Sequence, residues 1–466
     1  MRKWWPLVAV CLGAFMLLVD VTIVTVALPD MAGDLKASFS ELQWVMDVYA
    51  LALAALLLGA GSLADLLGRR RVYVAGLLFF ALASLACGLA PNAATLIAAR
   101  AAQGLGGAAM FATTMALLNS TYRGRDRGMA FGVWGAVNGA AAAAGPILGG
   151  LLTEHLDWRA IFLVNLPVSV ITVVLTLAVV AESRRADGAR PDPWGMLFFT
   201  AAAGALTYGL IEAGDRGFTA GRTLLAFAVA ACASVAFVVV ENRRPQPMLD
   251  LALFRRPSFV AVMLAGALLM ASAFAILAYT SVWLQQVLGL GPVRAGAALV
   301  PMAAAAFVSS GLSGRFLANV APRLPIGVGL LLVAAGSAAQ AVLDASSDAW
   351  AVLPGLVVGG IGVGVSIPVL SSAVMASVPA ERGGMAAGAL NTFRQLGYAL
   401  GVAVLGLVFR DGVEGHPAGG PRAAYATALD HAYLVAAGFG VVGGLLVLAL
   451  VRETAPAEVR APASAH

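Results

Sequence analysis

The sequence predicts an all-α polytopic membrane protein with fourteen transmembrane helices. Of its 466 residues, 61% are hydrophobic and 11% are charged, whereas soluble domains carry about 25% charged residues. Apolar runs of about 20 residues, the length of a membrane-spanning helix, recur from one end of the chain to the other. A water-soluble fold could not bury this much apolar surface, so the soluble classes are excluded.

Each expected helix is an apolar run bounded by charged residues or by glycine and proline. The first run follows Arg2 and Lys3, but its length and the lack of a small-residue cleavage motif indicate a helix rather than a signal peptide. The predicted spans are 5–28, 43–64, 72–90, 95–118, 128–152, 160–181, 194–211, 224–240, 258–284, 295–314, 324–343, 350–375, 386–409 and 432–451.

The basic residues predict the orientation of these helices. With the N-terminus inside, most of the 29 Lys and Arg residues fall in cytoplasmic loops, and Arg100 and Arg394 lie within spans. Cytoplasmic loops carry an excess of basic residues, so both termini are expected in the cytoplasm. The net charge of +5 therefore reports orientation and gives no reason to expect a nucleic-acid partner. The arginine-, alanine- and glycine-rich composition favours a bacterial cytoplasmic membrane.

An internal repeat with an offset of 256 residues divides the chain. It matches Gly104 with Gly360, Gly106 with Gly362, 128–130 with 384–386, Gly132 with Gly388 and Gly145 with Gly401. The repeat predicts two six-helix halves, 1–185 and 257–466, with two additional helices in 186–256. Two halves related in this way place a transporter's substrate site near the membrane midplane between them.

The loop between the second and third spans reads GSLADLLGRRR, residues 61–71. It resembles the cytoplasmic loop motif of the major facilitator superfamily, which implies that Gly61, Asp65, Gly68 and Arg69 gate the cytoplasmic side. The alternative is an arginine cluster that only fixes orientation. An acid near lipid is costly without a partner, so Asp65 favours the gate.

Two charged residues lie inside apolar spans. Asp20 belongs to the run LLVDVTIVTVALP of the first span, and Arg100 precedes Gln103 by one helical turn in the fourth. Charges within a membrane are by default functional. The alternatives are an Asp20 permanently hydrogen-bonded to threonine or backbone, and an Arg100 that reaches the outer interface.

The fifth span ends GPILGG, residues 145–150. It resembles the antiporter motif of the same superfamily, which implies that Gly145, Pro146, Gly149 and Gly150 allow tight helix packing and favour export. The family's preceding glycine is here Ala141.

Together these motifs resemble the fourteen-helix drug:proton antiporters, a family of the major facilitator fold. The run of the first span, with WRAIFLVNLP at 158–167 and NTFRQLG at 391–397, supports this resemblance. It implies efflux of amphipathic, drug-like molecules in exchange for protons, with Asp20, Arg100 and Gln103 coupling the proton. Some relatives carry acids on the thirteenth helix and this chain has none, which disfavours dicationic substrates.

The pocket residues and the remaining alternatives are less strongly marked. Trp134, Asn138, Asn391 and Arg394 are candidates to line the substrate pocket, and Asp47 and Glu212 lie near the outer interface, where solvation explains them. No Walker A loop, HExxH or GxSxG motif indicates an enzyme, and neither a metal nor a cofactor is expected. Proton-coupled nutrient uptake and a non-transporting sensor remain as alternatives, and the antiporter motif argues against uptake.

Overall fold

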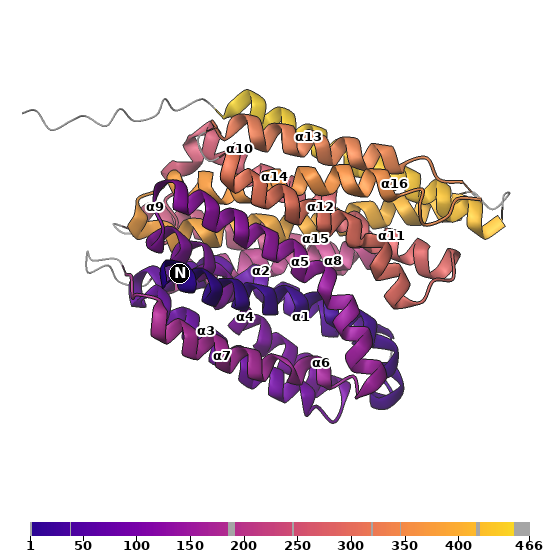
Figure 1. Cartoon of the computed structure of the whole chain (residues 1–466), viewed down its shortest axis with the longest axis horizontal. Coiled ribbons are helices and arrows are strands. Elements are labelled where there is room, and N and C mark those ends of the chain that lie inside the picture. Colours follow the sequence, from indigo (N-terminus) through magenta and orange to yellow (C-terminus); the bar gives the residue numbers. More distant parts are fainter. Residues whose placement is uncertain are drawn as a thin grey trace, which may run out of the picture.

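The fold is a bundle of long helices that run roughly side by side (Figure 1). The computed structural model describes residues 2–37, 39–184, 192–244, 247–317, 320–344, 346–415 and 420–451. Thirteen helices among them are long and apolar enough to cross a membrane. The protein is therefore a multi-pass membrane protein.

The helices follow the predicted spans closely. Those of the first predicted half are α1 (Trp5–Leu35), α2 (Phe39–Leu67), α3 (Arg69–Gly88), α4 (Ala93–Thr121), α5 (Gly124–His155), α6 (Ala160–Leu163) and α7 (Asn165–Val179). The predicted insert forms α8 (Pro193–Arg216) and α9 (Gly221–Arg243). The second half forms α10 (Pro257–Leu269), α11 (Ala275–Val282), α12 (Pro292–Phe316), α13 (Arg323–Gln340), α14 (Leu353–Ala376), α15 (Gly383–Gly415) and α16 (Gly420–Leu450).

Two predicted spans are interrupted helices. The sixth is divided into α6 and α7, and the ninth contains the π-helical turn Met270–Phe274 between α10 and α11. Helix α5, which covers the fifth predicted span, is not among the thirteen membrane-crossing helices of the described residues. The count of fourteen therefore stays a prediction.

The 256-residue repeat corresponds to equivalent helix contacts. Gly106 packs α4 against Phe80 of α3, and its counterpart Gly362 packs α14 against Val333 of α13. Gly145 packs α5 against Thr22 of α1, and Gly401 packs α15 against Ala271 and Ala275. Small residues let helix backbones approach closely in a membrane, so the matched glycines occupy matched contacts.

The bundle has one end that we call the inner end, where α1 begins and α16 finishes (Figure 1). The start of the chain is held there by an ion pair of 2.7 Å between Lys3 and Asp126, which lies near the start of α5. The positive-inside prediction assigns this end to the cytoplasm. The segments 185–191 and 452–466, which belong to that prediction, lie outside the described residues.

The two halves meet closely near the inner end. Gly132 of α5 approaches the backbone of Gly314 on α12, where an added Cβ would lie 2.9 Å from its Cα. Gly388 of α15 likewise approaches the backbone of Leu57 and Leu58 on α2. The α5–α12 and α2–α15 contacts therefore bring the two predicted halves together near the inner end.

Helix α8 lies along the α2–α15 side of this seam. Tyr208 stacks on Trp44 of α2 with ring centroids 5.9 Å apart, and Gly204 faces Ala55 of the same helix. At the far end of α8, Arg410 of α15 donates a hydrogen bond to the carbonyl of Gly214. Helix α9 packs on α8, and α8 contacts both α2 and α15, one helix from each predicted half.

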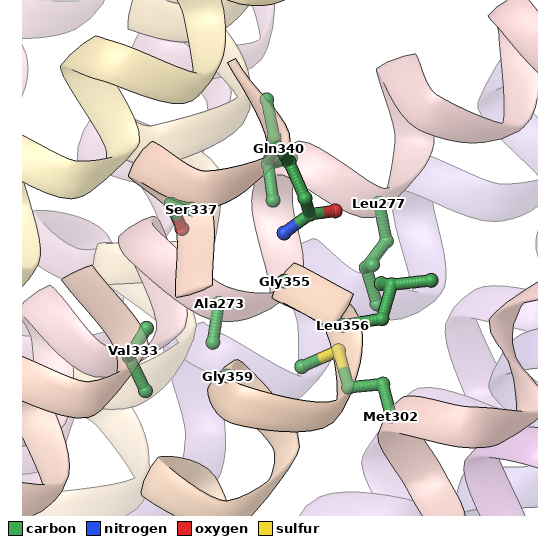
Figure 2. Close-up of a pocket in the computed structure, with 10 residues that line it drawn as sticks. Ala273, Leu277, Met302, Val333, Ser337, Gln340, Gly355, Leu356 and Gly359 are labelled. Atoms are coloured by element: carbon green, nitrogen blue, oxygen red, sulfur yellow. The ribbon is translucent and has the colours of Figure 1, made fainter. Parts of the chain in front are cut away.

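A small cavity lies within the second half, among the π-helical turn Met270–Phe274, α11, α12, α13 and α14 (Figure 2). Met302, Leu277, Ser337 and the amide of Gln340 face it. Gly359 forms part of its wall, and a Cβ added there would meet no atom within 4 Å. None of the sequence-predicted site residues lines this cavity.

The neighbouring glycines of α14 give a matched test of the packing. A Cβ on Gly360 would overlap the carbonyl oxygen of Met302, whereas one on Gly359 enters open space. We expect Gly360→Ala to lower the stability of the purified protein by about 1–3 kcal/mol through overpacking, and Gly359→Ala to be tolerated. Thermal unfolding in detergent measures both, and equal melting temperatures for the two variants would contradict this packing.

Candidate functional site

The most heavily buried charges of the first half converge on one carboxylate. Arg100 Nη1 lies 2.6 Å from Asp20 Oδ2, which joins α4 to the middle of α1. Gln103 and Asn165 donate side-chain hydrogen bonds of 2.9 Å and 2.8 Å to Asp20 Oδ1. The exposed fractions of Asp20 and Arg100 are 0% and 1%. This buried network therefore connects α1, α4 and α7.

Arg100 is held from several directions. Its Nε donates to the carbonyl of Val45 on α2 at 3.1 Å, and its Nη1 donates to Gln103 Oε1 at 2.6 Å. The guanidinium lies 4.2 Å from the ring centroid of Tyr49 and 5.8 Å from that of Phe162. These contacts combine charge-assisted hydrogen bonds with cation–π attraction.

The network shows the partners of the two residues for which the sequence left alternatives. Arg100 does not reach the outer interface, because its side chain is buried and paired with Asp20. The hydrogen-bond donors to Asp20 are the side chains of Arg100, Gln103 and Asn165 rather than threonine or backbone. Removing one partner of a buried pair leaves the other charge uncompensated, which costs about 3–5 kcal/mol.

Sequence reasoning missed two members of the network. Asn165 stands in the quoted run 158–167, where its position at the start of α7 gave no sign of a contact with α1. Ser84 of α3 accepts a hydrogen bond of 2.8 Å from Gln103 and is fully buried. A serine within an apolar helix carries no sequence signal of this kind.

The predicted antiporter residues pack α5 directly beside Asp20. A Cβ on Gly145 would overlap Thr22, and one on Gly149 would lie 2.8 Å from the carbonyl oxygen of Ile23. Both contacted residues follow Asp20 within one turn of α1. Gly150 is buried, and the backbone of Pro146 continues the helix. The glycines therefore tie α5 to the segment of α1 that carries the buried acid.

The predicted gate residues join the two halves. Asp65 pairs with Arg69 at 2.8 Å and accepts hydrogen bonds from the backbone amides of Gly384 and Met385 at 2.9 Å and 3.0 Å. A Cβ on Gly61 would overlap the carbonyl of Gly384. One acid of α2 thus satisfies the orphan amides at the start of α15.

The turn after Asp65 requires glycine. Gly68 has φ 111°, a conformation that side chains with a Cβ rarely adopt, and a Cβ would also lie 2.7 Å from the carboxylate carbon of Glu182. That carboxylate accepts hydrogen bonds from the backbone amides of Arg70 and Arg71 at 3.1 Å and 3.2 Å. The carboxylate of Glu182 therefore fixes the backbone immediately after Gly68.

The four predicted pocket residues share one property. Each has a buried polar atom without a hydrogen-bond partner within the part of the chain that the structure describes: Trp134 Nε1, Asn138 Oδ1, Asn391 Oδ1 and Arg394 Nε. Asn391 Nδ2 donates to the carbonyl of Phe111 on α4 at 3.4 Å, which places that face of α15 against the first half. Unsatisfied buried polar atoms are costly, so these four atoms are available to a polar ligand group.

One of the two secondary candidates differs from the expectation of simple solvation. Glu212 is buried and pairs with Arg216 at 3.2 Å, so solvation was the wrong explanation for it. Its position on α8, which packs against α2 and α15, removes it from water. Asp47 is partly buried on α2.

The outer end of α1 carries an exposed acid, Asp34, in contrast to the buried Asp20. Asp34 is exposed and pairs with Arg159 at 2.6 Å, and Trp158 Nε1 donates to it at 3.1 Å. Hydrogen bonds from Arg159 and Trp158 hold the pKa of Asp34 below its usual value. This carboxylate lies outside the membrane-crossing part of α1.

The chain resembles known proteins along most of its length. The Major Facilitator Superfamily model matches residues 10–402. The chain is 39% identical over 403 residues to the multidrug resistance protein Stp of Mycobacterium tuberculosis strain CDC 1551 / Oshkosh, covering 86% of this chain and 75% of Stp. It is 36% identical over 413 residues to the tetracenomycin C resistance and export protein of Streptomyces glaucescens, covering 87% and 76%.

A solved structure shares the fold. The human organic anion transporter MFSD10 matches with a TM-score of 0.69 and 16% identity, over 96% of this chain and 99% of that one. At this identity the match bears on the fold alone. With the family match over most of the chain, it leads to one conclusion: the chain belongs to the major facilitator superfamily.

Proposed function

We propose that this protein exports amphipathic, drug-like small molecules across the bacterial cytoplasmic membrane in exchange for protons. The observation that carries the proposal is the buried Asp20–Arg100 pair beside the glycines of α5. The relatives named for multidrug resistance and for tetracenomycin C resistance and export support efflux as the direction.

Asp20 is the proton carrier in this proposal. Protonation removes the charge on which Arg100, Gln103 and Asn165 converge, and an uncompensated Arg100 is unfavourable in the bundle interior. The packing of α1 against α4 therefore changes with the proton. Gly145 and Gly149 transmit the change to α5, which contacts the second half through α12.

The contacts of Asp65 serve as the gate of the inner end. Asp65 binds Arg69 in its own half and the start of α15 in the other. These bonds break when the inner end opens to the cytoplasm and re-form when it closes. Substrate binds between the halves, where Trp134, Asn138, Asn391 and Arg394 offer polar atoms in apolar surroundings.

Asp20→Asn tests the proton carrier. The amide keeps the shape but cannot exchange a proton, so we expect proton-driven export to be lost while membrane insertion is retained. Asp34→Asn, which alters an exposed acid of the same helix, is the matched control. Drug accumulation in cells, with and without a proton uncoupler, measures export. Full resistance in cells carrying Asp20→Asn would refute this role.

Asp65→Asn tests the gate. Loss of the charge weakens the pair with Arg69 and both backbone bonds to α15, a buried contribution of about 3–5 kcal/mol, and favours an open inner end. We expect a cysteine placed at Leu57, which is fully buried between α2 and α15, to be alkylated several-fold faster in this variant. Arg71→Gln, an exposed position on the same turn, is the control, and unchanged alkylation in Asp65→Asn would contradict the gate.

A further inference from the structure

Arg394 is a buried cation that the proposed proton and gate steps leave unused. Its side chain is 6% exposed, its Nε has no hydrogen-bond partner, and no ion pair involves it among the described residues. The buried arginines Arg69 and Arg100 each pair with an acid. Arg394 is therefore the exception among buried arginines of the described chain.

Arg394 lies on the face of α15 that contacts the first half. It lies one helical turn after Asn391, whose amide reaches the carbonyl of Phe111 in the other half. On its other side, Gly266 of α10 leaves room for its stem, since a Cβ there would lie 3.4 Å from Arg394 Cγ. Neighbours three residues apart share a helix face.

The internal repeat gives a second argument for this position. The 256-residue offset that matches Gly132 with Gly388 and Gly145 with Gly401 also matches Asn138 of α5 with Arg394 of α15. Asn138 Oδ1 is buried without a partner, as is Arg394 Nε. Equivalent positions of the repeat thus carry the neutral amide of Asn138 in the first half and the positive charge of Arg394 in the second.

A guanidinium buried without a counter-charge is stable only when something supplies one. Arg394 Nε is a donor without a partner among the described residues, and none of the four proposed pocket residues is acidic. Arginine presents a planar fork of N–H groups that matches carboxylate and sulfonate oxygens. The missing partner is therefore an anion rather than a cation.

We propose that the substrates of this transporter are amphipathic anions whose acidic group pairs with Arg394. This inference rests on the proposed export function and assigns its substrate class. Arg394 is the specificity-determining residue, and Asn138 is its uncharged counterpart in the other half.

The test uses matched fluorescent probes in proteoliposomes with an imposed pH gradient. Naphthalenesulfonates keep their charge at all working pH values, and the corresponding neutral sulfonamides have the same ring system. We expect the wild-type protein to transport sulfonates with a lower Michaelis constant than sulfonamides. Arg394→Gln should raise the Michaelis constant for sulfonates about 10-fold or more, as expected for the loss of a charge-assisted hydrogen bond. The Michaelis constant for sulfonamides should rise far less.

Two further variants separate charge from shape and folding. Arg394→Lys keeps the positive charge but lacks the planar guanidinium, and it should preserve part of the preference for sulfonates. Arg222→Gln removes an exposed arginine at the start of α9 and should leave the preference unchanged. Equal rises for both probes in Arg394→Gln would show a structural role and overturn the inference.

The outcomes also distinguish the inference from the function on which it rests. Proton-dependent transport of sulfonamides but not sulfonates by the wild-type protein would refute the anion assignment and leave the export function standing. Transport of neither probe class would count against the export function, and the inference would fall with it.

Discussion

The pairing of Asp20 with Arg100 is the interaction on which the rest of the first half depends. Two opposite charges are removed from water in a segment surrounded by apolar side chains, which is tolerable only when further hydrogen bonds satisfy both. Gln103, Asn165 and the Val45 carbonyl supply those bonds. Groups from α1, α2, α4 and α7 consequently converge on this one buried pair.

Close contacts at glycine residues connect the helix of Asp20 to the rest of the bundle. Where Gly149 meets Ile23 of α1 and Gly132 meets Gly314 of α12, the backbones approach too closely for any side chain, so movement of one helix requires movement of the next. The same close packing brings Gly61 to the start of α15, where Asp65 binds two backbone amides. Close contacts at glycine and the side chain of Asp65 thus connect α1, α5 and α12 on one side and α2 and α15 on the other.

The sequence predicts the helices and the single residues better than their partners. Apolar runs of membrane-spanning length located the helices, and a charge inside such a run singled out Asp20 and Arg100, because both signals are local. Their pairing across 80 residues of chain depends on tertiary packing, as does the contribution of Ser84. For the same reason Glu212 was wrongly expected to be solvated: only the packing of α8 against α2 and α15 removes it from water.

The central claim is that Asp20 binds and releases a proton within its buried network. Infrared difference spectroscopy of the purified protein during a pH step measures carboxyl protonation directly, without a substrate. The account predicts a protonated-carboxyl band in the wild-type protein that is missing from Asp20→Asn and unchanged in Asp34→Asn. The same band with undiminished amplitude in Asp20→Asn would contradict it.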